Sequence, residues 1–311
     1  MRPQDRPLSW TEFIDRWGPY SIAIDGYVAD KPALDSRLPV ANLNHHENVS
    51  RLETRASCAQ ALLEIRVGLF KVFRKGNDLE ARVFANDCDE DVCLTYYLLS
   101  HSWIAESVIN PRLNKLVSLV DLLDTCSGMY PLPIDMPILS ELAWVFEPYR
   151  RFRMSGGLEK RDPAAFTDVV TNVCNRIEKF IVGENGVIPL DARYNVLKRG
   201  TGWAMIEEIG PYGRQGALAD GIHAFVSAKE RADGRWSYSV CRISELIAFP
   251  VPEILIACDE EEKNPSDHWG GGTTTGGSGR NHGSRQNPDH VFGTVESEVL
   301  HFKEEGIENL V

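Results

Sequence analysis

Acidic residues and histidines follow three short apolar segments of this chain. The three combinations are segment 21–24 with Asp25, segment 39–43 with His45 and His46, and segment 81–85 with Asp87, Asp89 and Asp91. Carboxylates and imidazoles are frequent ligands of divalent metal ions in proteins. If the apolar segments are parallel strands, their carboxyl ends meet at one edge of a sheet, where open α/β proteins bind their ligands. The spacing therefore predicts a metal site at that edge.

Each of these polar groups also has a simpler interpretation. Asp87, Asp89 and Asp91 repel one another unless a cation or the start of a helix compensates their charge, but an acidic run is also typical of a solvated turn. Asp25 stands before a glycine, which is a common turn pair. Asp124 is expected near the end of a helix, where negative charge is unfavourable, so it should pair with a cation or a metal.

Strand and helix signals alternate in the first part of the chain. Besides the three apolar segments, we expect helices over residues 54–65, 92–99 and 111–123, the first capped by Thr54 or Ser57. This alternation predicts an α/β fold with a mainly parallel sheet flanked by helices. We place this metal-binding domain at residues 1–131 and a helical connector, entered through three prolines, at residues 132–200.

The last part of the chain has a different pattern, and we expect a smaller α+β lobe at residues 201–311. Its predicted elements are a hairpin of segments 224–227 and 236–240, a strand-like apolar run at 252–258, a glycine-rich loop at 270–280 and a C-terminal helix at 296–311. This lobe is the predicted substrate-binding domain.

Composition narrows the functional classes. The chain has 311 residues, 43% of them hydrophobic and 25% charged, so it can bury a sizeable core. Its net charge of -12 argues against long nucleic acids as partners. Seven cysteines without a zinc-type spacing suggest free thiols, and no apolar run is long enough to cross a membrane. We therefore expect a cytoplasmic protein without membrane association.

The polar segments together resemble the DHH phosphoesterase superfamily. Its acidic signature, Asp-x-Asp-x-Asp-Gly-x-x-Ser, is similar to residues 87–95, with Val92 and Thr95 in place of the glycine and the serine. Its two further aspartate signatures are similar to Asp25, at a strand end, and to Asp124, which threonine follows. The order of the segments differs from that of the family, as if the sheet were circularly permuted.

The resemblance extends to a histidine pair and to the C-terminal lobe. Residues 44–46 are similar to the Asp-His-His signature, with Asn44 in place of the aspartate, and we expect this change to tune the site without loss of metal. Residues 239–244 are similar to a Ser-x-Arg-Ser strand of the DHH-associated subdomain. Residues 270–273 are similar to its Gly-Gly-Gly-His loop, with Thr273 in place of the histidine.

The resemblance implies a centre of two divalent ions, with manganese preferred and magnesium as the alternative. Asp25 would bridge the two ions, and His46 would face the phosphoryl group as a hydrogen-bond donor or general acid. The implied catalytic residues are His46, Asp25 and Arg280. The implied metal ligands are Asp25, His45, Asp87, Asp89, Asp91 and Asp124.

The glycine-rich loop fits a phosphate-binding role. Glycines let backbone N–H groups approach an anion, and arginines bind phosphate through two parallel hydrogen bonds. The same composition is typical of a flexible linker, so that interpretation stays open. The predicted substrate-binding residues are Arg242, Gly271, Gly272, Thr273, Thr274, Ser278, Arg280 and Arg285.

The sequence thus predicts a metal-dependent hydrolase of a small phosphorylated, nucleotide-like molecule, and it permits a homodimer. Two alternatives remain. One is a metal-dependent enzyme of a specialised biosynthetic pathway with non-phosphate chemistry. The other is a non-catalytic nucleotide- or phosphate-binding protein that keeps the fold.

Overall fold

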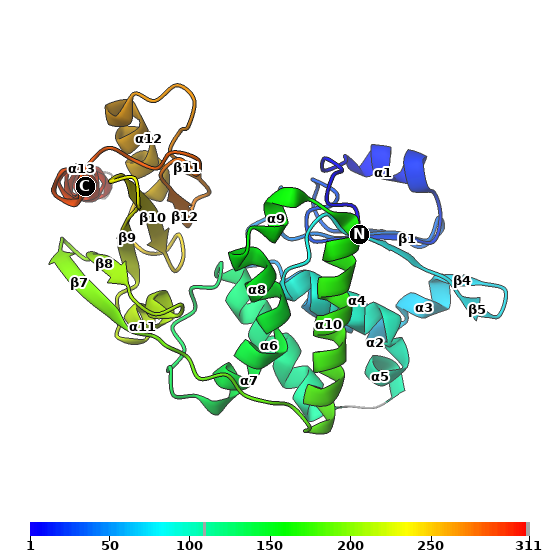
Figure 1. Cartoon of the computed structure of the whole chain (residues 1–311). Coiled ribbons are helices and arrows are strands. Elements are labelled where there is room, and N and C mark those ends of the chain that lie inside the picture. The colour runs from blue at the N-terminus through cyan, green and yellow to red at the C-terminus, as the bar shows by residue number, and fades with distance from the viewer. Residues whose placement is uncertain (108–109, 309–311) are drawn as a thin grey trace. The chain divides into compact units, whose positions relative to one another are not determined.

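A computed structural model describes residues 1–107 and 110–308 (Figure 1). The chain forms two compact units. The first consists of Met1–Thr125 and Pro137–Pro189, and the second consists of Cys126–Met136 and Leu190–Val311. The expected α/β class is confirmed, since both helices and parallel strand pairs are present.

The first unit is built on a four-stranded sheet with the order β2-β3-β1-β6. Its strands are β1 (Ser21–Ile24), β2 (Ala33–Asp35), β3 (Val40–Leu43) and β6 (Arg82–Phe84). The central strand β1 runs parallel to β3 and β6, and β2 is an antiparallel edge strand. In the register of β1 and β3, Ile24 lies opposite Leu43. The residues that follow these two strands therefore emerge side by side, as the sequence predicts.

Helices cover both faces of this sheet. Helix α1 (Trp10–Trp17) inserts Phe13 against the edges of the Tyr27 and Phe84 rings on one face. Helices α2 (Ser57–Val67) and α4 (Glu90–Ser100) lie on the other face (Figure 1). Both have buried residues on more than one side, which explains why their apolar residues are not confined to a single narrow stripe.

The predicted connector is not a separate region. Its helices α7 (Pro137–Val145), α8 (Glu147–Met154) and α10 (Pro163–Val182) belong to the first unit. The apolar face of α10, which includes Phe166, Val173 and Ile177, is buried where α10 packs on α4 and α8. The boundaries 132–200 were wrong because this face completes the core of the first unit. The remaining elements of this unit are α3 (Leu69–Val72), β4 (Arg74–Lys75), β5 (Asp78–Leu79), α5 (Ser102–Ser107), α6 (Pro111–Thr125) and α9 (Gly157–Lys160).

The second unit contains a six-stranded sheet with the order β11-β12-β10-β9-β8-β7. All neighbouring strands are antiparallel except β8 and β9, which are parallel. The strands are β7 (Tyr194–Arg199), β8 (Ala204–Glu208), β9 (Ala224–Glu230), β10 (Trp236–Arg242), β11 (Gly270–Gly271) and β12 (Thr275–Gly277). The predicted hairpin is confirmed as β9 and β10. Strand β7 was missed, because it lies inside the expected connector.

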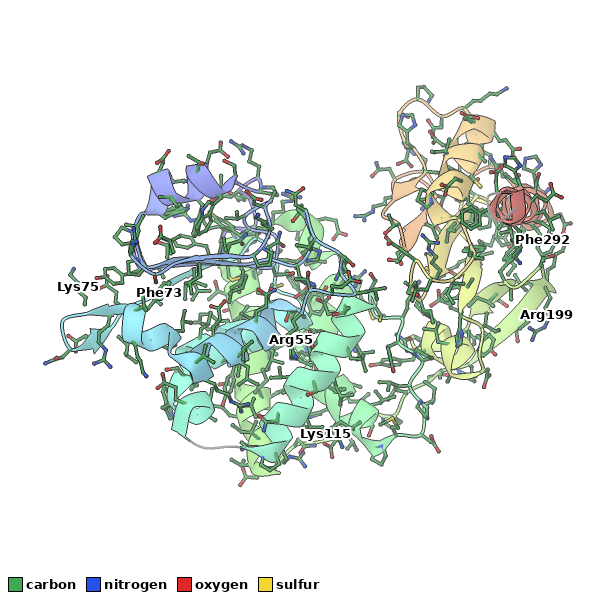
Figure 2. The ribbon with its side chains drawn as sticks, turned by 180° about the vertical axis from the view of Figure 1, so that it is seen from behind. Arg55, Phe73, Lys75, Lys115, Arg199 and Phe292 are labelled. Carbon is green, nitrogen blue, oxygen red and sulfur yellow. The ribbon has the colours of Figure 1, made fainter. Side chains whose placement is uncertain are left out.

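Three helices accompany this sheet: α11 (Gly213–Ala219), α12 (Val251–Glu262) and α13 (Pro288–Glu308). The apolar run at 252–258 is therefore a helix and not a strand. Ile254, Leu255 and Cys258 follow a helical spacing and are buried in the core of the unit, together with Trp203. In the same unit the ring of Phe292, a residue of α13 that Figure 2 labels, contacts the Trp203 ring. Helix α13 agrees with the expected C-terminal helix up to residue 308, and residues 309–311 lie outside the described part.

Within the described residues, no helix combines the length and the apolar character that crossing a bilayer requires.

One carboxylate in the first unit should give stability a pH dependence. Burial raises the pKa of Glu64, on α2, from 4.5 to about 7, and its buried Oε2 atom has no hydrogen-bond partner among the described residues. Between these two pKa values the folded state keeps a proton that the unfolded state has lost. The contribution of Glu64 is thus fully present below pH 4.5 and is lost as the pH rises through 7.

We expect Glu64→Gln to make stability less dependent on pH. In denaturant unfolding followed by circular dichroism, the loss of unfolding free energy from pH 5 to pH 8 should be smaller in the variant by about 2–3 kcal/mol, given about 1.4 kcal/mol for each shifted pKa unit. An unchanged pH dependence would show that Glu64 titrates normally.

Candidate metal centre

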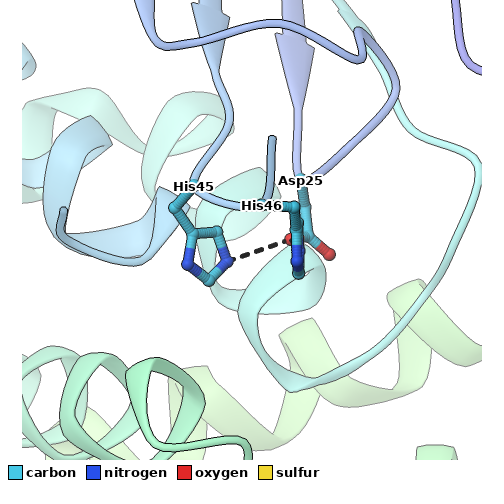
Figure 3. A group of neighbouring side chains, drawn as sticks. All are labelled: Asp25, His45 and His46. Carbon is cyan, nitrogen blue, oxygen red and sulfur yellow. Dashed lines mark hydrogen bonds and ion pairs between the residues drawn. The ribbon is translucent and has the colours of Figure 1, made fainter. Parts of the chain in front are cut away.

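The carboxylate of Asp25 meets both histidines at the carboxyl end of the parallel strands. Its Oδ1 atom lies 3.2 Å from Nε2 of His45 and 2.6 Å from Nε2 of His46 (Figure 3). Asp25 directly follows β1 and has a left-handed backbone, with φ of 46°. Aspartate is one of the few residues that adopt this conformation readily. The turn aims the carboxylate at the histidines that follow β3.

His45 is surrounded by carboxylates. Besides its contact with Asp25, Nε2 of His45 lies 2.8 Å from Oδ2 of Asp124 and 3.9 Å from Oδ2 of Asp91. The ring is fully buried, and its Nδ1 atom has no hydrogen-bond partner among the described residues. Oxygen atoms from three carboxylates therefore face one imidazole nitrogen, from the ends of β1, α4 and α6.

This arrangement contains two groups of side chains that can hold a metal ion. One group is Asp25, His45 and His46, and the other is His45, Asp91 and Asp124. Within each group the ligand atoms lie within 4.8 Å of one another, close enough to meet at one cation. Carboxylate oxygens combined with imidazole suit manganese, zinc or iron, so the donor set alone does not select the metal.

The pKa shifts show that the cluster lacks positive charge. Burial lowers the pKa of His45, but its contacts with Asp124 and Asp25 outweigh burial and raise the pKa to about 10. Burial together with the charges of Asp124 and Asp25 raises the pKa of Asp91 to about 7. Burial also opposes ionisation of Asp25, yet hydrogen bonds from the two histidines bring its pKa below the usual range. A divalent cation would neutralise this excess of carboxylates and displace the proton of His45.

Asp91 has a second function, because it caps a helix far away in the sequence. Its Oδ2 and Oδ1 atoms accept hydrogen bonds of 2.8 Å from the backbone N–H groups of Ser57 and Cys58, at the start of α2. The carboxylate of Asp121 accepts the preceding N–H group, from Ala56, at 2.7 Å. The expected caps from Thr54 or Ser57 were therefore wrong, since α2 has no local side-chain cap. Two remote carboxylates satisfy its free N–H groups instead.

The other two aspartates of the acidic run lie outside both groups. Asp89 is the N-cap of α4, and its Oδ1 atom accepts the Val92 N–H at 2.9 Å. Asp87 accepts the N–H of Cys88. Burial and the charges of Asp25 and Asp87 raise the pKa of Asp89 well above its usual range, so its charge is close to the cluster. Ligation of a metal by Asp87 and Asp89 stays a prediction.

Helix α8 brings groups to the acidic run that the sequence analysis did not assign to the site. Burial and the charges of the acidic run raise the pKa of Tyr149 far above its usual value. The charge of Arg153 counteracts the burial that raises the pKa of Asp87. Arg150 donates to Glu90 in the first turn of α4 at 2.9 Å. Three arginines, Arg150, Arg151 and Arg153, lie within four positions of the sequence. They could have indicated positive charge near the acidic run, but we expect a helical connector there from the sequence.

Asn44 holds the backbone of the histidine loop and does not orient a ring. Its Oδ1 atom accepts the N–H groups of His45 and His46, at 2.9 and 3.1 Å. Its Nδ2 atom donates to the carbonyl of Asp30 at 2.8 Å and to Oε2 of Glu47 at 2.7 Å. Asparagine supplies two acceptor and two donor contacts here, whereas aspartate could supply only acceptors. The loop that Asn44 stabilises therefore explains an asparagine at this position.

We expect Asn44→Asp to destabilise the protein, although it restores the aspartate of the DHH signature. The new carboxylate would face the Glu47 carboxylate and the Asp30 carbonyl at a fully buried position. Loss of buried hydrogen-bond donors costs about 1–3 kcal/mol, and repulsion adds to this. Thermal unfolding should show this loss of stability, and the double variant Asn44→Asp with Glu47→Gln should recover part of the stability. A variant as stable as the parent would refute this account of Asn44.

The predicted substrate-binding residues lie in the second unit, where several have structural contacts. The guanidinium of Arg242 is buried and donates to the carbonyls of Thr273, at 2.9 Å, and Ile247, at 3.1 Å. The Ser278 hydroxyl accepts the N–H of Tyr238. Arg280 and Arg285 are exposed. These contacts show how the glycine-rich segment is anchored, and substrate binding by it stays a prediction.

The glycine-rich segment is not a flexible linker. It forms the hairpin of β11 and β12, and β12 pairs with β10. A Cβ atom on Gly271 would come within 2.3 Å of the Gly276 backbone, and one on Gly277 would come within 2.2 Å of the Tyr238 carbonyl. Packing of backbone on backbone therefore requires these glycines. Among the glycines of this hairpin, Gly270 has open space around the missing Cβ atom, and Gly272 would make only an ordinary contact, 4.0 Å from the Thr275 carbonyl oxygen.

Comparisons with known proteins do not assign the chain to a family. No protein-family model matches the chain, and neither a curated protein nor a solved structure is significantly similar to it.

Proposed function

We propose that this protein is a divalent-metal-dependent hydrolase that acts on a small phosphorylated molecule. The observation that carries the proposal is the group of carboxylate oxygens from Asp25, Asp91 and Asp124 around one nitrogen of His45. The resemblance of the same segments to DHH phosphoesterases supports phosphoryl chemistry with manganese. The second unit, with its anchored hairpin, is the proposed substrate-binding lobe.

The described residues supply both metal ligands and substrate contacts in this proposal. Asp25, His45, Asp91 and Asp124 would hold the metal, with Asp87 and Asp89 as further ligands. When bound, the metal supplies Lewis-acid activation of water and stabilisation of negative charge. His46 is partly exposed and would face the phosphoryl group as a hydrogen-bond donor or general acid. Arg280, an exposed residue that follows β12, is a proposed phosphate contact.

The two alternatives differ from this proposal in what they predict. A metal enzyme with non-phosphate chemistry would bind manganese but hydrolyse no phosphate ester. A non-catalytic phosphate-binding protein would show no turnover even when saturated with metal.

The test is metal binding followed by an activity panel. Isothermal titration of the chelator-treated full chain with Mn²⁺ should show binding that is lost when His45 is replaced by glutamine. The loaded protein should then hydrolyse at least one of three probes, bis(p-nitrophenyl) phosphate, p-nitrophenyl phosphate or pyrophosphate, and EDTA should abolish turnover. If neither Mn²⁺, Mg²⁺ nor Zn²⁺ binds, the proposal fails. Binding without turnover on the panel would favour the alternatives.

A further inference from the structure

Arg51 contacts two members of the metal cluster at once. It lies in the loop between β3 and α2 and is half-buried. Its Nη1 atom lies 3.3 Å from Nδ1 of His46. Its Nη2 atom donates to the backbone carbonyl of Asp124 at 2.8 Å and lies 3.6 Å from Oδ1 of the same residue. One guanidinium thus joins the histidine loop to the end of α6.

The contact with His46 holds its ring between Arg51 and Asp25. A guanidinium group has only donors, so Nδ1 of His46 accepts the hydrogen bond from Arg51. The carboxylate of Asp25 has only acceptors, so Nε2 of His46 donates to its Oδ1 atom, at 2.6 Å. In this orientation Nε2 is a donor and not a ligand, although His46 belongs to one of the two possible metal groups.

The contact with Asp124 offsets an unfavourable position. Asp124 lies in the last turn of α6, where the helix dipole and the free carbonyl groups disfavour a negative charge. Arg51 binds one of these carbonyls and places a positive charge beside the carboxylate. The other carboxylate oxygen of Asp124 stays directed at Nε2 of His45.

We propose that Arg51 is a positioning residue of the metal centre: it holds the His46 ring with Nε2 directed at Asp25, and it holds Asp124 as a ligand. The inference rests on the proposed function for its catalytic meaning, but the contact with His46 can be detected without metal or substrate. The competing interpretation is an ordinary surface ion pair, which contributes little and whose loss would leave the His46 ring in place.

The test compares Arg51→Met with Arg51→Lys and with a matched control, Arg55→Met. Arg55 is an exposed arginine of the same loop, labelled in Figure 2, and its replacement removes the same charge. Long-range ¹H–¹⁵N spectra of the histidine rings, with His46→Gln to assign the signal, should give the same Nδ1 signal of His46 in the parent and in Arg55→Met. In Arg51→Met this signal should shift, because the hydrogen bond to Nδ1 is lost, and Arg51→Lys should be intermediate.

Mn²⁺ binding and turnover provide the second readout. Loss of a group that orients metal ligands lowers affinity or activity about 10–100-fold. We expect this loss of Mn²⁺ affinity in Arg51→Met, together with a lower kcat and a similar KM on the phosphodiester probe, and less than about a twofold change in Arg55→Met.

The outcomes separate the two proposals. An Arg51→Met variant that matches Arg55→Met in the Nδ1 signal of His46 and in Mn²⁺ affinity overturns the role of Arg51. A parent protein that binds no metal overturns the proposed function, while the Nδ1 signal still decides whether Arg51 holds the His46 ring.

Discussion

Asp25→Asn should abolish metal binding and metal-dependent hydrolysis while the fold remains. Asparagine keeps the size of the side chain and one acceptor for the histidines, but it removes the charge that both Nε2 atoms face. It also tolerates the left-handed backbone of residue 25, which alanine would strain. Removing residues that only orient ligands already costs about 10–100-fold, so loss of this central ligand should lower Mn²⁺ affinity more than about 100-fold.

The matched control is Asp15→Asn, which removes the same charge from an exposed position of α1. This helix lies on the face of the sheet that α2 and α4 do not cover. Titration calorimetry with Mn²⁺ and hydrolysis of the phosphodiester probe should distinguish the two variants, and circular dichroism should show that both are folded. If Asp25→Asn retains Mn²⁺ affinity and turnover within about threefold of Asp15→Asn, Asp25 is not a metal ligand.

The sequence predicted where the carboxylate and histidine side chains meet because that prediction used local signals. Strands β1 and β3 are short and largely apolar, and each ends directly before a polar residue, while Ala85 separates β6 from Asn86. Once two such strands are parallel and in register, the side chains that follow them must lie close together. No contact between distant residues had to be guessed for Asp25, His45 and His46 to meet.

The errors have the opposite cause, because they depend on partners far away in the chain. The cap of α2 comes from Asp91 and Asp121, which no local capping rule identifies. The helices after residue 136 return to the first unit because α10 buries an apolar face there. A short apolar run such as 252–258 fits a strand or a buried helix equally well until its neighbours are known.

Asp91 is a metal ligand in the prediction from local sequence signals, and it also caps α2 through a long-range contact that the sequence does not predict. Its two oxygens accept the N–H groups of Ser57 and Cys58, and both of these residues are fully buried. Asp91→Ala would leave two buried N–H groups without acceptors, and each buried donor left unsatisfied costs about 1–3 kcal/mol. Above pH 7, where Asp91 is ionised, relief of its repulsion with Asp124 and Asp25 offsets part of this loss.

We therefore expect Asp91→Ala to lower the unfolding free energy of the metal-free protein by about 2–4 kcal/mol at pH 5. The pKa of Asp91 is raised to about 7, so its favourable contribution is present at low pH and is lost as the pH rises through 7. The difference between parent and variant should thus narrow at pH 8. Added Mn²⁺ should widen it again, because only the parent retains this ligand.

Asp121→Ala separates the two roles of Asp91. Asp121 caps the same helix through Ala56 but belongs to neither metal group, so its loss should destabilise the protein less and leave Mn²⁺ affinity unchanged. Chemical unfolding at pH 5 and pH 8, with and without Mn²⁺, measures all three proteins on one scale. Equal Mn²⁺ stabilisation of the parent and Asp91→Ala would leave Asp91 with the capping role alone. Equal stability without metal would contradict the cap, since two buried N–H groups cannot lose their acceptors without cost.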